Sequence, residues 1–400
     1  MGLPRVKLAL VTETYPPEVN GVAMTLHRLV SGLAARGHEI EVVRPRQDGE
    51  ARIPGRERQV GRVTEWLVPG LPIPFYQTLK MGLPVWGALR RRWRAQPPGV
   101  VHVATEGPLG LAALRAARRL GLPVTSSFHT NFHHYGRHYG LNRLRDAITA
   151  YLRWFHNATA LTMVPTDEIR AQLAAHGFAR LAVMARGVDA SLFSPARRRT
   201  ELRASWGAGP DDPVFIHVGR LAAEKNLGLA VETFLLMQRI EPRARCILVG
   251  DGPARAALQK MYPQFHFAGM RRGEELAAHY ASADVFIFPS TTETFGNVVT
   301  EAMASGLAVL AFDYAAARQH IVTGKNGLTV PLGEARAFTA AAADLLARRP
   351  AWPGLRTAAR ETALGITWER VVGQFEDELL RAHAKKSAVA SAVALTASPG

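Results

Sequence analysis

Short apolar runs alternate with longer amphipathic segments along most of the 400-residue chain. The runs are rich in Val, Ile, Leu and Phe, which predicts buried β-strands. They fall at 6–11, 39–43, 100–104, 123–128 and 160–165 in the first half, and at 214–218, 245–249, 265–268, 285–288 and 308–312 in the second. Between them, segments such as 21–35 have the apolar spacing of a helix. Strands separated by helices predict an α/β fold with parallel sheets.

The length of the chain and the placement of its turn residues predict two domains. A single domain usually has roughly 100–200 residues. Pro, Gly and Arg cluster between 194 and 212, which favours a boundary there. We therefore expect one domain over 1–195 and another over 205–367. Residues 387–400 lack any hydrophobic period and are expected to be a disordered tail.

Composition narrows the class of protein. A hydrophobic fraction of 48% is enough for packed cores and excludes a disordered chain. The single cysteine, Cys246, excludes an internal disulfide framework and fits a reducing compartment. No stretch approaches the ~20 apolar residues that span a bilayer, and the run at 6–11 is too short for a signal peptide. We expect a cytoplasmic protein.

Positive charge is concentrated in the first half. Residues 1–200 hold 28 Lys and Arg against 13 Asp and Glu, whereas residues 201–400 hold 21 against 20. Nearly all of the net charge of +16 thus belongs to one domain. Such an asymmetry favours an anionic partner, with nucleic acid, an anionic lipid surface and an acidic acceptor as candidates.

The segment 292–301 has the clearest chemistry. A predicted strand ends just before Glu293, and a predicted helix begins at Gly296 and Asn297 and carries Glu301. Were the stretch helical throughout, the two acids would lie roughly 12 Å apart along the axis. Free backbone N–H groups from Phe295 to Val298 would face an anion between them. The layout predicts a site for a nucleotide sugar, with hydroxyls at both ends and phosphates between.

This Glu-x7-Glu element resembles the signature of retaining glycosyltransferases of the large family 4 type, and the likeness extends over about 6–380. The resemblance implies a GT-B fold, in which two Rossmann-like domains face a central cleft. The first domain would bind the acceptor and the second the donor. A helix at about 368–385 would cross back to the first domain.

The resemblance also implies roles for residues that follow predicted strands, where parallel sheets bind ligands. Arg220 and Lys225 would hold the donor diphosphate, and His129 would lie near the donor sugar. Glu293 would contact the sugar ring, and Glu301 the ribose hydroxyls. We take the catalytic set as His129, Arg220, Lys225 and Glu293, and the donor-binding set as Gly21, Phe295, Gly296, Asn297, Val298 and Glu301.

Two of these assignments have simpler alternatives. Gly21 begins a helix where an anion contact is expected, yet Asn20 before it is also a common helix cap. His129, His133, His134 and His138 lie close together in the sequence. They lack the Cys or His-Glu-x-x-His pattern of zinc sites, so we expect no metal and no cofactor other than the sugar donor.

The segments 129–132 and 312–317 look like those of bacterial GDP-mannose-dependent α-mannosyltransferases, which are close to glycolipid synthases that use UDP-sugars. We therefore expect mannose transfer from GDP-mannose to a lipid-linked or glycan acceptor, with a UDP-sugar glycolipid transferase as the alternative. The family usually has Glu where this chain has Gln319. A sugar-nucleotide epimerase is a weaker candidate, and no motif supports a nucleic-acid-binding protein.

One basic segment bears on the acceptor. Arg90, Arg91, Arg92 and Arg94 surround Trp93 on a predicted helix. Such a helix can lie on an anionic membrane, or it can pack Leu89 and Trp93 against the sheet with its arginines in water. The excess of positive charge in the first domain favours an enzyme that is peripheral on the inner face of the cell membrane.

Overall fold

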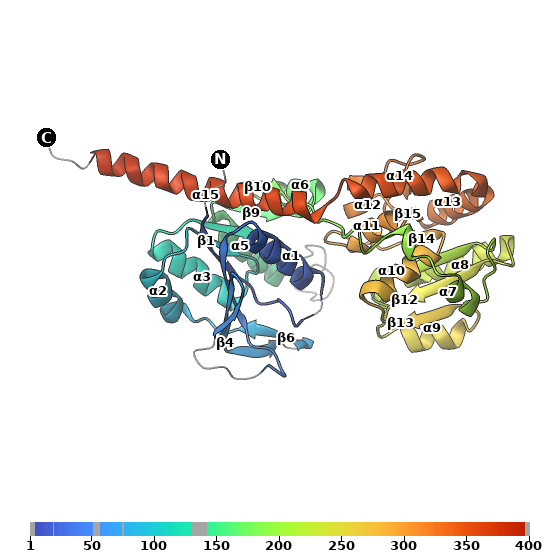
Figure 1. Ribbon diagram of the computed structural model, residues 1–400, viewed down its shortest axis with the longest axis horizontal. Coiled ribbons are helices and arrows are strands. Elements are labelled where there is room, and N and C mark those ends of the chain that lie inside the picture. Colours follow the sequence, from blue (N-terminus) through green and yellow to red (C-terminus); the bar gives the residue numbers. More distant parts are fainter. Residues whose placement is uncertain (1–4, 19, 51–56, 74–75, 130–141, 397–400) are drawn as a thin grey trace. The chain divides into compact units, whose positions relative to one another are not determined.

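In the computed structural model the chain divides into two units, shown in Figure 1. Unit 1 comprises Met1–Arg186 and Trp368–Gly400, and unit 2 comprises Gly187–Thr367. The structure describes residues 5–18, 20–50, 57–73, 76–129 and 142–396. Both units alternate strands with helices, so the predicted α/β fold is confirmed.

Unit 1 is built on a sheet with the strand order β10-β9-β8-β7-β1-β2-β4-β3, in which only the pairing of β3 with β4 is antiparallel among the described strands. Its strands are β1 (Lys7–Val11), β2 (Glu39–Pro45), β3 (Glu57–Val60), β4 (Val63–Val68), β7 (Val100–Val103), β8 (Val124–Ser127), β9 (Leu161–Val164) and β10 (Leu181–Val183), with a separate hairpin of β5 (Gly70–Ile73) and β6 (Tyr76–Gly82). Its helices are α1 (Gly21–Ala35), α2 (Trp86–Ala95), α3 (Pro108–Arg119), α5 (Asn142–Asn157), α6 (Asp167–Ala175) and α15 (Trp368–Thr396).

The sheet of unit 1 is buried on both faces, which explains why its strands are continuous apolar runs. Successive side chains of β1 point to opposite faces. Leu8 and Leu10 therefore pack in one core with α1 and α15, whereas Ala9 and Val11 pack in another with α2 and α3.

The C-terminal helix α15 returns to unit 1, as predicted. It packs along α1 and reaches β7 and β8. Glu376 on α15 is buried and makes two hydrogen bonds to the rest of unit 1, with Arg36 Nη1 at 2.8 Å and with His38 Nε2 at 2.7 Å. The helix continues to Thr396, so residues 387–396 differ from the expected disordered tail.

Unit 2 has a sheet of parallel strands in the order β13-β12-β11-β14-β15-β16. Its strands are β11 (Val214–Val218), β12 (Arg245–Val249), β13 (His266–Gly269), β14 (Val285–Phe288), β15 (Ala308–Phe312) and β16 (Leu328–Val330). Its helices are η2 (Pro195–Arg197), α7 (Thr200–Ser205), η3 (Ala223–Lys225), α8 (Leu227–Ile240), α9 (Arg255–Met261), α10 (Gly273–Ser282), α11 (Asn297–Ala304), α12 (Ala315–His320), α13 (Ala335–Ala347), η4 (Arg349–Ala351) and α14 (Trp352–Leu364).

The residues near the domain boundary expected from the sequence make hydrogen bonds within unit 2. Asp284 precedes β14 and is buried. Its carboxylate accepts hydrogen bonds from Arg198 and Arg203, each at 3.1 Å. Arg360 on α14 donates to the carbonyls of Ala190 and Phe193. Unit 2 therefore begins at Gly187, ahead of the expected position.

Candidate active site

The strand order of unit 2 reverses between β11 and β14, and such a switch point leaves a crevice at the carboxyl ends of the two strands. The loop after β11 is held close to its neighbours. A Cβ on Gly250 would lie 1.9 Å from the carbonyl oxygen of Gly219, so only glycine fits there. Asn226 Nδ2 donates to Pro289 O at 3.2 Å and ties the loop to the end of β14.

Lys225 and Glu293, predicted from separate motifs, meet at this point. Lys225 Nζ donates to Glu293 Oε1. Ser290 Oγ donates to the same oxygen at 2.7 Å, and Tyr314 Oη donates to the backbone oxygen of Glu293 at 2.9 Å. The second carboxylate oxygen of Glu293 has no hydrogen-bond partner among the described residues. It is therefore open to a ligand hydroxyl.

Arg220 comes from the same loop but is held loosely. Its side chain is 59% exposed, and Nη1 lies 3.4 Å from Glu224 Oε1. An exposed ion pair of this kind contributes little to stability. The guanidinium can therefore turn toward an anion without disturbing the fold.

The start of α11 leaves its first amides open. Gly296 has φ 90°, a left-handed conformation that favours glycine, and no side chain caps the helix. Phe295 is buried with its ring edge-on to His320, and Asn297 Oδ1 is buried without a partner among the described residues. An uncapped helix start presents N–H groups and partial positive charge to an anion.

Glu301 lies on the next turn of α11. Tyr280 Oη donates to Glu301 Oε2 at 3.1 Å. Burial raises the pKa of Glu301 to about 7. Because this pKa is close to neutral pH, the carboxyl can change its charge when a ligand hydroxyl binds to it.

In unit 1, Gly21 is the first residue of α1, as expected. Asn20 Oδ1 accepts hydrogen bonds from Val22 N at 3.1 Å and Ala23 N at 2.8 Å. The alternative role of Asn20 as a helix cap is therefore present, and it occupies two amides that an anion would otherwise contact.

His129 follows β8 at the carboxyl edge of the same sheet. Both ring nitrogens are buried and lack a hydrogen-bond partner among the described residues. Burial, followed by the charge of Arg186, lowers the pKa of His129 well below its usual range, so the ring is neutral. His133, His134 and His138 lie outside the described residues.

Sequence reasoning missed two residues at the edge of the sheet in unit 1. Glu13 follows β1, and its Oε1 accepts from Leu109 N at 3.0 Å at the start of α3. Burial raises the pKa of Glu13 to about 7. Arg186 follows β10 and is buried beside Gly21. The position of each directly after a strand is the signal that could have found them.

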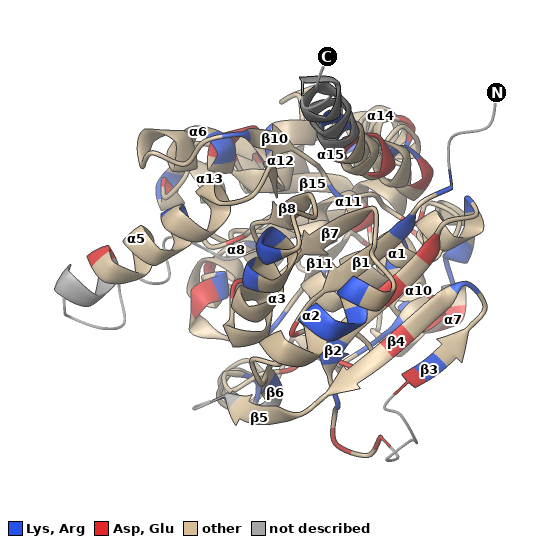
Figure 2. Ribbon diagram, turned by 90° about the vertical axis from the view of Figure 1, so that its left-hand side faces the viewer, with Lys and Arg blue, Asp and Glu red and all other residues tan. Residues whose placement is uncertain are grey.

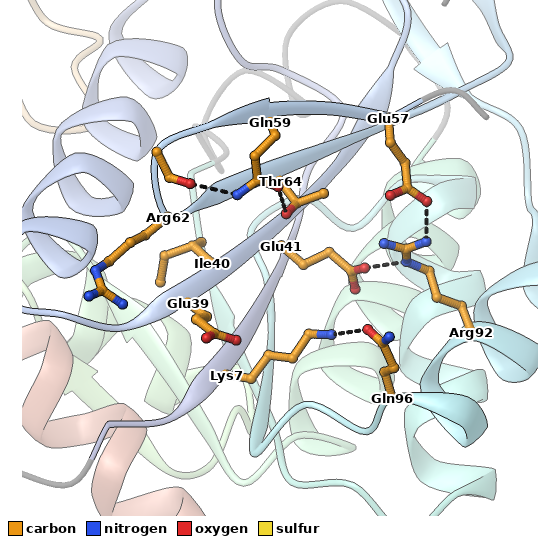
Figure 3. Close-up of a pocket in the computed structure, with 11 residues that line it drawn as sticks. Lys7, Glu39, Ile40, Glu41, Glu57, Gln59, Arg62, Thr64, Arg92 and Gln96 are labelled. Carbon is orange, nitrogen blue, oxygen red and sulfur yellow. Dashed lines mark hydrogen bonds and ion pairs between the residues drawn. The ribbon is translucent and has the colours of Figure 1, made fainter. Parts of the chain in front are cut away.

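A hollow of about 410 Å³ lies elsewhere on unit 1 (Figure 3). It adjoins the amino ends of β1 and β2, opposite the edge that binds ligands in parallel sheets. Several of its polar groups are bonded within the hollow: Arg92 bonds Glu41 and Glu57, and Lys7 Nζ donates to Gln96 at 2.9 Å. The hollow therefore makes a poor candidate for the active site.

The basic helix α2 packs Leu89 and Trp93 against the sheet, which is the second of the two alternatives that the sequence left open. Leu89 and Trp93 are buried, and Trp93 Nε1 donates to Glu41 at 2.8 Å. Arg91 and Arg94 are exposed, whereas Arg92 is bonded to the carboxylates of the hollow. Figure 2 shows the arginines of α2 and of the neighbouring α3 in blue.

Membrane-spanning helices and clusters of metal-binding side chains are both absent from the described residues. No helix in them is both long and apolar enough to cross a bilayer. Nor do three His, Cys, Asp or Glu side chains within those ranges gather as metal ligands do.

Comparison with known proteins places these features in a family. Residues 19–192 match the model of Glycosyltransferase Family 4, and residues 212–348 match that of Glycosyl transferases group 1. The chain is 37% identical to a GDP-mannose-dependent alpha-mannosyltransferase of Mycobacterium tuberculosis, over 94% of this chain and 95% of that protein. It is 28% identical to an alpha-monoglucosyldiacylglycerol synthase of Acholeplasma laidlawii, over 81% and 84% of the two chains.

A solved structure agrees on the fold. Sucrose-phosphate synthase from Thermosynechococcus elongatus superposes with a TM-score of 0.75 at 20% identity, covering 94% of this chain and all of that one. The open amides and the Lys225–Glu293 pair lie at the carboxyl ends of strands in this fold, at the switch point of unit 2. The chain belongs to the glycosyltransferases of the family 4 type, and it is a hexosyltransferase with the GT-B fold.

Proposed function

We propose that the protein transfers mannose from GDP-mannose to a hydroxyl group of a lipid-linked or glycan acceptor, with retention of configuration and without a metal ion. The observation that carries the proposal is the Lys225–Glu293 pair beside the uncapped start of α11. The identity of the donor is supported by the similarity to GDP-mannose-dependent relatives.

In this proposal, the charge that builds up on the leaving diphosphate is stabilised by fixed groups of unit 2. Lys225 and Arg220 supply cations, and the first amides of α11 supply hydrogen-bond donors. Such preorganised groups act where charge develops in the transition state. The ion pair with Glu293 holds Lys225 in place before the donor arrives.

The carboxylates fix the two ends of the donor. The open oxygen of Glu293 accepts from a sugar hydroxyl while the other stays bonded to Lys225 and Ser290. Glu301 accepts from the ribose diol, with Tyr280 keeping its carboxyl oriented. His129, neutral and with both nitrogens unfilled, bonds a hydroxyl near the reacting carbon.

We propose that the acceptor hydroxyl attacks on the same face that the diphosphate leaves, so that the departing phosphate takes its proton. NMR of the product tests this step. An α-linked product from the α-linked donor is expected, and a β-linked product would contradict the proposal.

A thermal-shift panel of GDP-, UDP- and ADP-sugars tests the donor. GDP-mannose is expected to raise the unfolding temperature most, because a ligand that binds only the native state stabilises it. A larger shift with a UDP-sugar would favour the glycolipid transferase alternative, to which the chain is also similar. Conversion of the donor without any acceptor would indicate an epimerase.

We also propose that unit 1 brings the enzyme to the anionic inner face of the cell membrane. The exposed residues that support this lie on α2, α3 and α5 and are Trp86, Arg91, Arg94, Arg115, Arg118, Arg119 and Trp154. Arginines interspersed with tryptophan suit a lipid surface. Pelleting with anionic liposomes at low salt, lost at high salt, is expected. No pelleting at low salt would remove this part of the proposal.

A further inference from the structure

A buried histidine, His217, lies at the switch point of unit 2. It is near the carboxyl end of β11, and its side chain is fully buried. Its ring nitrogen Nδ1 lies 3.0 Å from the carbonyl oxygen of Ile287 on β14. The backbone pairing of the two strands includes Ile216 and Phe286. The imidazole therefore links β11 and β14 one residue further toward the crevice.

The contact with Ile287 fixes which ring nitrogen carries the hydrogen. Burial lowers the pKa of His217 to about 4, so the ring is neutral at neutral pH. A neutral imidazole has one N–H donor and one acceptor nitrogen. A carbonyl oxygen can only accept, so Nδ1 holds the hydrogen and Nε2 is the acceptor. Nε2 is buried and has no hydrogen-bond partner among the described residues.

Nε2 faces the loop that follows β11. A Cβ added to Gly219, directly after the strand, would lie 3.7 Å from it. The ring stacks on Phe288, with 5.9 Å between the ring centroids and 26° between their planes. The next residue, Pro289, accepts a hydrogen bond from Asn226 in that loop. The charge of Lys225 is close enough to act on the ring. The acceptor nitrogen is thus buried beside the loop that holds Lys225.

An acceptor nitrogen beside a cation can hold that cation in place. A buried acceptor without a donor costs free energy. Its attraction to an ammonium group is strong in the interior, because little water screens it. The ammonium group of Lys225 has three N–H donors, and Glu293 Oε1 accepts from one of them. Two donors remain, so one can bond a diphosphate while another bonds an acceptor behind it.

We propose that His217 is a positioning residue for Lys225, whose ammonium group it holds toward the donor diphosphate through the lone pair of Nε2. Because Nε2 has no direct partner among the described residues, the contact runs through a bridging water. A second N–H at this point would repel the cation, so the bare nitrogen suits the role. The inference rests on the proposed function only in that Lys225 acts on a diphosphate.

A double-mutant cycle between His217 and Lys225 tests the contact. The ligand is inorganic pyrophosphate, which carries the diphosphate without base or sugar, and calorimetry measures its Kd. His217→Asn keeps a donor near the place of Nδ1 and removes the acceptor at Nε2. We expect it to weaken binding about tenfold, the scale of one hydrogen bond to a charged group. In the Lys225→Ala background we expect no further loss, because the cation is absent.

Two further variants separate positioning from packing. His217→Gln can place its amide oxygen where Nε2 lies, so it should restore most of the affinity. His279→Asn is the matched control. His279 is also buried in unit 2, and its Nδ1 lies 2.7 Å from the carbonyl oxygen of Glu275. This variant loses a similar ring and should bind pyrophosphate as the wild type does.

Unchanged affinity in a folded His217→Asn, or the same loss with and without Lys225, would overturn the inference. A loss in His217→Gln as large as that in His217→Asn would also overturn it, as would a wild type that binds no pyrophosphate. Circular dichroism reports folding. If His217→Asn does not fold, His217→Phe takes its place in the cycle, because it keeps an aromatic ring against Phe288.

The inference and the proposed function can fail separately. A wild type that binds pyrophosphate with the expected coupling, but neither binds GDP nor transfers mannose, would lose the proposed donor and keep the role of His217. Transfer of mannose from GDP-mannose without coupling between His217 and Lys225 would keep the function and remove the role.

Discussion

Both units have a sheet edge with a switch point, but the helix starts at the two edges differ in whether side chains cap them. Each has a parallel sheet with a switch point, between β11 and β14 in unit 2 and between β1 and β7 in unit 1. In unit 2 the start of α11 has no side-chain cap. In unit 1, Asn20 caps α1 and Glu13 bonds the start of α3. Unit 2 thus leaves its amides for a ligand, whereas unit 1 satisfies most of its own.

The largest expected effect concerns the backbone that supports the open edge of unit 2. Gly250 has φ 137°, and a Cβ there would lie 1.9 Å from Gly219 O. We expect Gly250→Ala to lower the free energy of unfolding by about 3 kcal/mol or more, since backbone must move. Chemical denaturation measures it.

The matched control for this variant is Gly228→Ala. Gly228 lies in α8, and a Cβ there meets nothing within 4 Å. Alanine is favoured over glycine in helices by roughly 0.5–1 kcal/mol, so the control should be as stable as the wild type or more so. Equal stability of the two variants would show that the loops of unit 2 are not held by this contact.

The next effect concerns catalysis at the same edge. Lys225→Ala and Arg220→Ala are each expected to lower kcat by roughly 10²-fold or more, the scale for losing a group that stabilises developing charge. The control is Arg239→Ala, which removes an exposed arginine from the last turn of α8. Steady-state kinetics at saturating donor measure the change. Near-wild-type turnover in both variants would mean that the cations of unit 2 do not act on the leaving group.

A pH-dependent effect is expected at Glu301. Its pKa in the folded state is raised to about 7, so ionisation opposes folding. The stability that the neutral carboxyl contributes is present below its unfolded pKa and is lost as the pH rises through about 7. We expect Glu301→Gln to gain unfolding temperature relative to the wild type between about pH 5 and about pH 8.

Glu361→Gln makes the same chemical change at an exposed position on α14 and serves as the control. A pH dependence of stability for Glu301→Gln no larger than that for Glu361→Gln would show that the carboxyl of Glu301 is solvated, and that unit 2 does not bury an acceptor there.

The smallest expected effect concerns the helix cap of α1 in unit 1. Asn20→Ala is expected to lower the free energy of unfolding by about 1 kcal/mol, the usual cost of losing a helix cap. Thr166→Ala removes the cap of α6 in the same unit and should cost a similar amount. A much smaller loss for Asn20 would mean that α1 tolerates open amides as α11 does.

The sequence predicted the interior strands of unit 2 closely, since β11, β12, β14 and β15 have the expected bounds. Strands buried on both faces are continuous apolar runs, which one sequence reveals. β3 escaped prediction because all of its residues are exposed and it lies at an edge.

Some residues of the candidate site could be predicted from the sequence, and others could not. Lys225 and Glu293 were predicted because each lies in the loop that follows a strand and matches a motif of the resembled family, and the structure bonds them across 68 positions. Glu13 was missed because its role depends on Leu109, 96 positions later. Its position after β1 marks the edge of the sheet, but the sequence does not show the contact with Leu109. Arg186 likewise acquires its setting only when β10 brings it beside Gly21.

The place of α15 in unit 1 bears on how the chain emerges from the ribosome. Unit 2 is one uninterrupted stretch of sequence, but the core between β1 and α1 is completed by Phe375 and Leu379 from the far end of the chain. During synthesis, the apolar side of α1 therefore stays uncovered until all of unit 2 has been made. A truncation before Trp368 should therefore leave the later-made half able to fold and the earlier-made half prone to aggregation.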